Sequence, residues 1–159
     1  MQSAKVQVSK YLIATVLLLS LSIIPLKYSS TLASNNPTNI IDQRMQLFKQ
    51  SEKSIRAIRY YIKAGEIDLA ANETEFHIKW STEMQDYFPV GSQASTNNIS
   101  KAAGDIWNNW EKFLNYKLEY QKKAEALKVA LQLQDDGLVK QSFVDMASAC
   151  KSCHQSFRN

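Results

Sequence analysis

The sequence predicts an all-α protein, an antiparallel four-helix bundle that runs up-down-up-down. Apolar residues recur at helical spacing in four segments, and no segment shows sustained alternation of period two. Two short connections and one moderate connection join these segments, as in an antiparallel bundle. The 159 residues include only four Gly and three Pro, which suits one compact helical domain better than a loop-rich β-sandwich.

The first 33 residues have the pattern of a secretory signal peptide. Two lysines precede an uncharged, mostly apolar stretch at 11–26, and small and polar residues follow it up to Ala33. That stretch is shorter than the about 20 residues that cross a bilayer. We therefore expect cleavage near Ala33, export to the periplasm, a bundle over 34–159 and no stable membrane span after signal removal. An uncleaved N-terminal anchor is the alternative.

The charge balance gives no sign of nucleic-acid binding once the signal is set aside. The chain has 19 Lys+Arg against 15 Asp+Glu, a formal net charge of +4. Three of the lysines and none of the acidic residues lie in the first 33 residues, so the remaining chain carries a net charge of +1. We expect no nucleic-acid partner, because no basic footprint remains.

The first helix is expected after the polar linker 34–39 and ends near Gly65, a residue suited to a helix C-terminus. Its core-facing stripe repeats every seven residues, with two more apolar residues at adjacent positions: Ile41, Phe48, Ile55 and Ile62, with Met45 and Ile58. The second helix is expected over about 68–87 and stops at Phe88-Pro89-Val90-Gly91. Its apolar side comprises Leu69, Ala70, Phe76, Trp80, Met84 and Tyr87.

One long loop is expected at 91–101, followed by a third helix over about 102–133. The buried face of that helix comprises Ile106, Trp110, Phe113, Leu114, Tyr120, Leu127, Ala130 and Leu131. Asp135-Asp136-Gly137 then breaks the chain and can cap a fourth helix over about 138–157. We expect the fourth helix to bury Leu138, Phe143, Met146, Ala147 and the cysteine face.

Chemistry is concentrated near the C-terminus, where Cys150-Lys151-Ser152-Cys153-His154 has the C-x-x-C-H spacing of c-type haem attachment. On a helix, positions i, i+3 and i+4 share one face. Cys150 and Cys153 can therefore form thioethers with the two haem vinyl groups, while His154 presents a ring nitrogen to the iron. This attachment takes place outside the cytoplasm in bacteria, in agreement with the signal peptide. We expect one covalently attached haem c.

Other interpretations of the two cysteines fit less well. A thiol redox pair belongs at a helix N-terminus beside a βαβ unit. A structural zinc site needs four ligands, and only His77 remains beyond the motif itself. A disulfide between residues three apart on a helix has poor geometry.

Topology predicts which residues surround the haem. In an antiparallel bundle the end of the fourth helix lies beside the start of the first, the end of the second and the start of the third. We therefore expect a haem environment made of Arg44, Met45, Phe48, Tyr87, Phe88 and the loop through Trp107.

The chain resembles the cytochromes c′, the four-helix-bundle class II c-type cytochromes, over about residues 40–158. The resemblance rests on Arg44-x-x-x-Phe48 and on Phe88-Pro89-Val90-Gly91-Ser92. It continues with Lys101-Ala-Ala-Gly-Asp-Ile-Trp107 and with Cys150-x-x-Cys-His-x-x-Phe-Arg158. The position of the C-terminal motif at the end of a helical chain, with the Phe-Pro and Ile-Trp elements, singles out this family.

The resemblance implies a role for each matching residue. His154 would be the proximal ligand, and Phe48 would occupy the distal position, where low-spin relatives carry a ligating Met. Arg44 would hydrogen-bond a haem propionate, a pairing that suits a guanidinium. Met45 and Lys101 match positions that line the haem edge, although Lys101 stands where members often carry a small, polar or acidic residue. Arg158 matches a basic residue near the proximal face.

A haem with His154 on one face and an apolar ring on the other has an open but crowded distal site. It favours NO and CO over O₂, because bound O₂ gains most from a hydrogen-bond donor. The resemblance likewise implies five-coordinate haem, NO binding and a role in NO handling or one-electron transfer. The redox partner protein cannot be named from the sequence. Cytochromes c′ are commonly homodimers through their first two helices, which predicts a homodimer here.

Two alternatives stay open at this point. Met45 lies near Phe48 on the same side of the helix and could supply a sixth ligand, which would give a six-coordinate, low-spin electron carrier. A haem peroxidase would need a distal His or Arg, and Arg44 lies one turn away from that position, so we expect no enzyme. His77, about ten residues from the haem end of its helix, is expected to be a surface or rim histidine.

Overall fold

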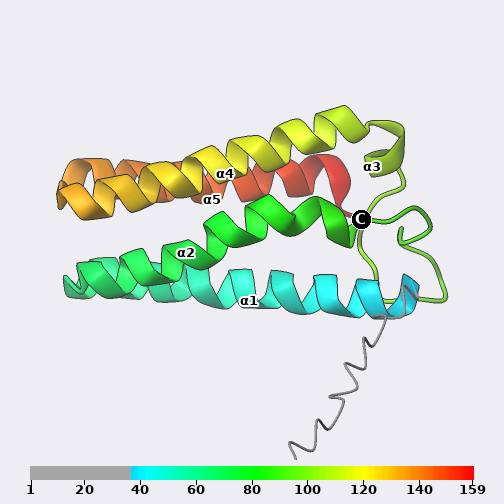
Figure 1. Ribbon diagram of the computed structural model, residues 1–159, viewed down its shortest axis with the longest axis horizontal. Coiled ribbons are helices and arrows are strands. Elements are labelled where there is room, and N and C mark those ends of the chain that lie inside the picture. The colour runs from blue at the N-terminus through cyan, green and yellow to red at the C-terminus, as the bar shows by residue number, and fades with distance from the viewer. Residues whose placement is uncertain (1–36) are drawn as a thin grey trace, which may run out of the picture. The chain divides into compact units, whose positions relative to one another are not determined.

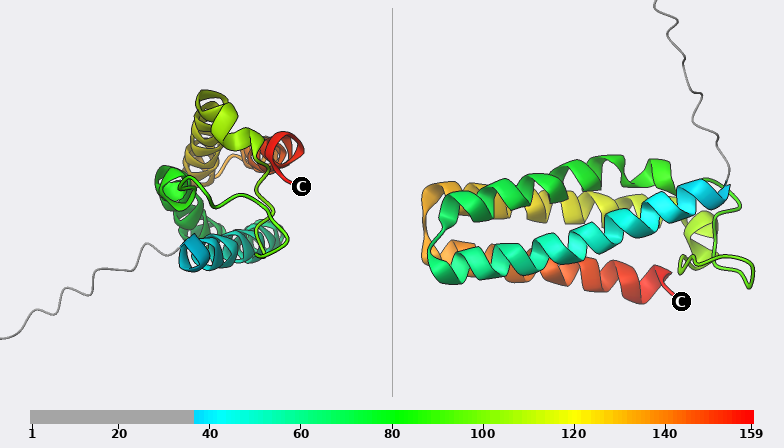
Figure 2. Two further views of the ribbon diagram at one scale, coloured as in Figure 1. Left: turned by 90° about the vertical axis from the view of Figure 1, so that its right-hand side faces the viewer. Right: turned by 90° about the horizontal axis from the view of Figure 1, so that it is seen from below.

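The computed structural model describes residues 37–159, and the predicted signal peptide with its cleavage site lies outside them. The described residues form α1 (Pro37–Ala64), α2 (Ile67–Glu83), the 3₁₀ helix η1 (Met84–Tyr87), α3 (Asp105–Asn108), α4 (Trp110–Leu133) and α5 (Asp136–Phe157). Figure 1 shows α1 and α2 as one antiparallel pair and α4 and α5 as another, and Figure 2 shows the four long helices around one core. The predicted all-α four-helix bundle is confirmed.

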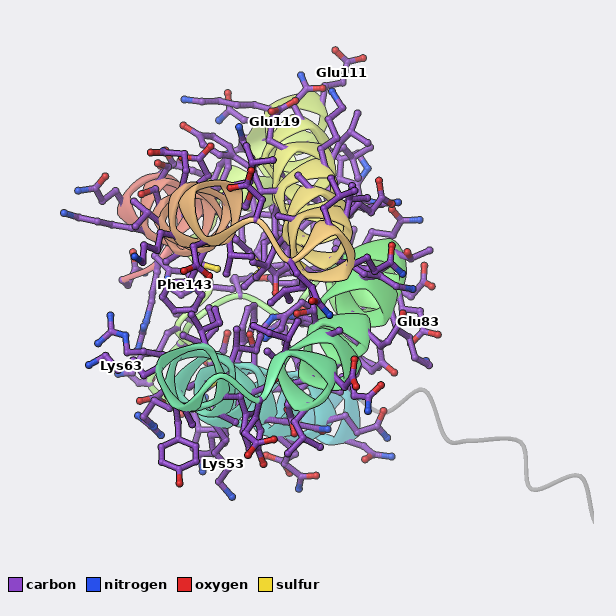
Figure 3. All side chains as sticks on the ribbon, turned by 90° about the vertical axis from the view of Figure 1, so that its left-hand side faces the viewer. Lys53, Lys63, Glu83, Glu111, Glu119 and Phe143 are labelled. Atoms are coloured by element: carbon purple, nitrogen blue, oxygen red, sulfur yellow. The ribbon has the colours of Figure 1, made fainter. Side chains whose placement is uncertain are left out.

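The core follows the heptad stripes. On α1, Ile41 and Ile58 are buried, whereas Phe48, Ile55 and Ile62 are half-buried. Gly65 follows α1 with a φ of 77°, which is the left-handed conformation that ends a helix at the residue after its cap. Charged side chains such as Lys53, Glu83 and Glu111 point away from the bundle in Figure 3, while Phe143 points inward between α5 and α1.

The second helix changes its winding near its end. α2 stops at Glu83, and Met84–Tyr87 continues the same direction as a 3₁₀ turn before Phe88. Tightening of the last turn into 3₁₀ geometry is common at helix ends. Trp80 and Met84 are buried as expected, but Leu69 is 44% exposed and does not belong to the core.

The third helix differs from the prediction, because it is not continuous from residue 102. A short α3 ends at Asn108, and α4 begins at Trp110 after a break at Asn109. The side-chain amide of Asn109 and its own backbone N–H both donate to the carbonyl oxygen of Asp105. An Asn that hydrogen-bonds nearby backbone in this way competes with helix propagation.

The fourth helix begins at its predicted cap. The Asp135 carboxylate accepts a hydrogen bond from the backbone N–H of Leu138 at 2.9 Å, as an N-cap does. The expectation that Leu138 is buried is wrong: it is 49% exposed, and Val139 is buried instead at 2%. At the start of α5 the buried position is therefore one residue later than predicted. Farther along the helix, Met146 is buried as expected.

Backbone hydrogen bonds connect the C-terminus to the segment that precedes α3. Ala102 and Arg158 form an antiparallel β-bridge. The backbone N–H of Ala103 donates to the carbonyl of Phe157, and that of Asn159 donates to the carbonyl of Lys101, both at 2.9 Å. These bonds hold the end of α5 against the loop. Within residues 37–159, none of the helices combines the length and the apolar character that a membrane crossing requires.

Candidate functional site

A cavity of about 530 Å³ lies among α1, α2, α4 and α5 near the end of the bundle where the C-terminus lies. Its volume is in the range of small-molecule and cofactor sites. Every residue predicted to bind the haem lines it: Arg44, Met45, Phe48, Lys101, Cys150, Cys153 and His154. Arg158, predicted beside the proximal face, also lines it.

The two cysteines and the histidine lie on one face of α5, as their spacing requires. Cys150 and Cys153 are free thiols that are half-buried and pack against the core. Burial raises the pKa of each thiol to about 11, and the nearby Cys153 adds to the effect at Cys150. Both thiols are therefore protonated at neutral pH, which is the opposite of the lowered pKa that a reactive redox cysteine has.

The zinc alternative finds no support in the described part of the chain. Residues 37–159 contain no group of three or more His, Cys, Asp or Glu side chains that could hold a metal ion. His77, the remaining candidate, does not line the cavity that contains the two cysteines.

His154 has the protonation state that an iron ligand needs. Burial lowers the pKa of its imidazole, and the positive charge of Arg158 lowers it further. The ring is therefore neutral at neutral pH and carries a free lone pair on one nitrogen. The Phe48 ring lies 5.9 Å from the His154 ring between centroids, with the planes inclined at 70°.

Phe48 is held in place by other aromatic rings. It packs edge-on against Trp80 with 5.3 Å between ring centroids, and against Phe88 with 6.5 Å. Such T-shaped pairs are favourable at these separations. The ring opposite His154 is thus part of a packed cluster, and it brings no hydrogen-bond donor to that face.

Arg44 is buried at 1% exposure, and its terminal nitrogens bind the loop after η1. Nη1 donates to the carbonyl of Tyr87 and the hydroxyl of Ser92, and Nη2 donates to the carbonyl of Ser92 and the hydroxyl of Ser100, at 2.6 to 2.9 Å. The guanidinium carbon also lies 4.4 Å from the centre of the Phe88 ring. Burial lowers the pKa of Arg44 to about 10, so it remains a cation at neutral pH.

This arrangement adds a role to the one that the resemblance implied for Arg44. All four N–H groups of its terminal nitrogens are directed at oxygens of the last residue of η1 and of the loop that follows, so the side chain fastens this segment to α1. None of the carboxylates in the described residues forms a salt bridge with it. A propionate contact by Arg44 stays a prediction.

The rest of the cavity lining is rich in cations. Lys49, Lys101, Lys117 and Arg158 line it together with one acidic residue, Glu52. The Glu52 carboxylate forms an ion pair with Arg56 at 2.5 Å, so its charge is already matched. A cofactor with anionic propionates suits this lining.

Two residues expected beside the haem do not line the cavity. Tyr87 contributes its backbone carbonyl to Arg44, and Trp107 donates its indole N–H to the carbonyl of Phe88 at 3.1 Å. Ile106, rather than its neighbour Trp107, reaches the cavity because α3 turns that side inward. The lining residues that were predicted only as core are Ile55, Trp80, Met84, Ile106, Phe113, Tyr120 and Ala147.

The prediction for His77 is wrong, because the side chain is completely buried at 0% exposure. Its Nδ1 lies 2.5 Å from the hydroxyl oxygen of Tyr120 on α4. Burial lowers the pKa of His77 to about 4. A single histidine within an amphipathic stretch gives no sequence signal for burial, because it fits a rim position equally well.

Comparison with known proteins identifies the family. The profile described as Cytochrome C' matches residues 39–158. The chain belongs to the cytochrome c′ family. A curated cytochrome c′ of Pararhodospirillum photometricum is 24% identical over 125 residues, covering 77% of this chain and 98% of that protein.

Solved cytochromes c′ share the fold of this chain. Cytochrome c prime of Shewanella frigidimarina aligns with a TM-score of 0.69 at 21% identity, covering 77% of this chain and 96% of that one. A nitric oxide complex of a variant cytochrome c prime from Alcaligenes xylosoxidans aligns with a TM-score of 0.68 at 17% identity, covering 77% and 95%. The cytochrome c′ family carries haem c, and the cavity with its two thiols, neutral imidazole and cationic lining fits that group.

Proposed function

We propose that this protein is a periplasmic haem c protein whose iron is five-coordinate and binds NO or CO at an apolar distal face, with single-electron transfer as a further role. Residues 1–33 would direct its export. The observation that carries the proposal is the opposition of His154 and Phe48 in one cavity. Bound haem would supply the gas-binding and redox chemistry, and the remaining steps belong to residues of the chain.

Cys150 and Cys153 would hold the group covalently and fix its position along α5. Their shared face and their place in the cavity wall support this role. His154 would coordinate the iron through a neutral ring, and its lowered pKa supports coordination without competition from a proton. Lys101, at the cavity wall, and Arg44, through its remaining Nε–H donor, would face the propionates.

Phe48 would set the ligand preference. Its ring cannot coordinate iron, and its packing against Trp80 and Phe88 limits how far it can move. A small diatomic ligand must fit against this apolar ring, and bound O₂ would find no donor from Phe48 to stabilise its partial negative charge. The cytochrome c prime whose nitric oxide complex shares this fold supports NO as a ligand.

Met45 is the residue that an alternative function depends on. It lines the same cavity and is half-buried, so it could serve as the sixth ligand of a low-spin electron carrier. The five-coordinate proposal is preferred because the ring packed against His154 belongs to Phe48. We propose ligand binding and electron transfer rather than catalysis.

We also propose that the protein forms a homodimer through α1 and α2. Tyr60 on α1 is 67% exposed and packs edge-on against Tyr61, which places aromatic surface on the outside of this helix. Sedimentation of the haem-loaded protein tests this proposal, since a dimer would sediment at about twice the monomer mass.

The experiment that tests the function measures attachment and gas binding on the same preparation. The protein is produced with its signal and a haem c maturation system and then isolated from the periplasm. Intact mass should show one added haem, and Cys150→Ser with Cys153→Ser should lose it. NO and CO should bind the ferrous protein, and Met45→Leu should leave both affinities unchanged. Tighter CO binding in Met45→Leu would favour the Met-ligated alternative instead.

A further inference from the structure

A histidine and a tyrosine form a buried hydrogen-bonded pair that gas binding does not use. His77 on α2 is 0% exposed, and Tyr120 on α4 is 4% exposed. The Nδ1 atom of His77 lies 2.5 Å from the Tyr120 hydroxyl oxygen, and the two rings are inclined at 87°. Tyr120 lines the haem cavity, whereas His77 does not, so the imidazole lies behind the phenol as seen from the cavity.

The protonation states of the pair follow from its burial. Burial lowers the pKa of His77 to about 4, so the ring is neutral at neutral pH. Burial raises the pKa of Tyr120, and the nearby Cys150 adds to this, while a hydrogen bond from Ser51 opposes it. The phenol therefore keeps its proton. In the His77 tautomer that carries its proton on Nε2, the phenol donates its hydrogen bond to Nδ1. The other ring nitrogen, Nε2, has no hydrogen-bond partner in residues 37–159.

This geometry is suited to loss of an electron coupled to movement of a proton. A phenol that loses an electron becomes a strong acid, so oxidation is favoured when a base already accepts its hydrogen bond. A proton moves readily between groups held at hydrogen-bond distance. Here the acceptor is within hydrogen-bond reach of the phenol, and Tyr120 also lines the haem cavity.

We propose that Tyr120 is a one-electron donor to the haem cavity and that His77 receives the phenolic proton. The inference rests on the proposed haem, and the oxidant is a hydroperoxide. Hydrogen peroxide accepts two electrons and two solvent protons as its O–O bond breaks and two waters form. Tyr120 supplies one of these electrons, and ferrous haem, when bound, would supply the other and become ferric. The O–H bond of Tyr120 breaks, and its proton moves to Nδ1, which leaves a neutral phenoxyl radical beside the His77 imidazolium.

Tyr116 provides an internal comparison. It lies one turn before Tyr120 on α4 and also lines the cavity, but its hydroxyl accepts a hydrogen bond from Ser156 at 3.1 Å. The structure pairs its hydroxyl with no imidazole. If proximity to the haem were sufficient, both tyrosines would be oxidised, whereas a requirement for the imidazole selects Tyr120.

The test treats the ferrous haem-loaded protein with one equivalent of hydrogen peroxide, freezes it and records the electron paramagnetic resonance spectrum. Ring-deuterated tyrosine identifies a tyrosyl signal by its narrowed hyperfine pattern. We expect that signal in the parent protein and in Tyr116→Phe, and its loss in Tyr120→Phe. No tyrosyl signal in the parent, or an unchanged signal in Tyr120→Phe, would overturn the proposal.

His77→Phe tests the proton acceptor separately, because it keeps a ring of similar size and removes Nδ1. We expect either loss of the signal or a radical with a larger gx value, since its oxygen would no longer accept a hydrogen bond from the imidazolium. An unchanged gx would exclude His77 as the acceptor. Optical spectra with CO, recorded before peroxide is added, show whether each variant is folded around haem. Failure of the proposed haem binding is therefore visible independently of the radical.

Discussion

The rings of Phe48 and His154 lie against each other in the cavity, with centroids 5.9 Å apart and planes inclined at 70°. One comes from α1 and the other from α5, so the two sides of the cavity are built by different helices. In the proposed haem protein, an iron held by His154 would have the Phe48 ring near its remaining face. This relationship would make the ligand site crowded and poor in hydrogen-bond donors.

Phe48→Ala should speed the association of CO with the ferrous protein by about tenfold or more, equivalent to ~1.4 kcal/mol of activation free energy. Removing the ring opens the face opposite His154 and takes away a contact that an entering ligand must displace. Flash photolysis of the CO complex measures the rate. Phe143→Ala is the matched control, because Phe143 is an inward-facing ring on α5 that does not line the cavity. Equal acceleration in both variants would argue against a specific role of Phe48.

Phe48→Met should convert the ferrous haem to a low-spin, six-coordinate form. The thioether would then occupy the position that the ring holds opposite His154. Absorption and magnetic circular dichroism detect the new ligand, and the affinity for CO should fall because CO must displace it. A Phe48→Leu control introduces a side chain close to Met in size but without a sulfur ligand, and it should remain high-spin. If the Phe48→Met protein remained high-spin, residue 48 would not lie close enough to the iron to be the distal residue.

Arg44→Met should lower the free energy of unfolding of the haem-loaded protein by about 3 kcal/mol, because buried loop oxygens lose their donors. Four hydrogen bonds connect this guanidinium to Tyr87, Ser92 and Ser100. Arg56→Met is the control, since Arg56 forms only an exposed pair with Glu52 and should cost less than about 1 kcal/mol. Urea titration measures both. Similar losses in the two variants would contradict the loop-fastening role.

The buried His77 should make the protein sensitive to mild acid. Its pKa is lowered to about 4 in the folded state from an ordinary value of 6.5, so the unfolded chain binds the proton more readily. The resulting stabilisation is complete above pH 6.5 and is lost as the pH falls from 6.5 to 4. Between pH 7 and pH 4 the free energy of unfolding of the parent protein should fall by about 3 kcal/mol more than that of His77→Phe. Parallel pH profiles of the two proteins in urea titrations would show that His77 is not the responsible group.

The sequence predicted the architecture and the residues that gather around the cavity because most of them had a local signal. Heptad spacing marks the stripe on α1, and the C-x-x-C-H spacing defines one face of α5. Topology then places Arg44 and Phe48 at the same end as His154, where the structure has them. These inferences depend on helical periodicity, the C-x-x-C-H spacing and chain topology, so they hold even if the predicted helix ends are wrong by one or two residues.

The errors arise where tertiary contacts decide. The break at Asn109 carries no Gly or Pro, and only the hydrogen bonds to Asp105 reveal it. Leu138 and Val139 compete for one core position at the start of α5, and the packing selects Val139. His77 could not be predicted as buried because its partner, Tyr120, lies 43 residues away in the chain. Neither residue alone indicates the pair.

The absorption spectrum of the ferrous haem-loaded protein, before and after CO is added, tests the central claim most directly. Five-coordinate iron behind Phe48 predicts a high-spin ferrous spectrum that shifts completely to the CO form. A low-spin ferrous spectrum that does not respond to CO would contradict the account, since it would require a sixth protein ligand, with Met45 as the first residue to examine.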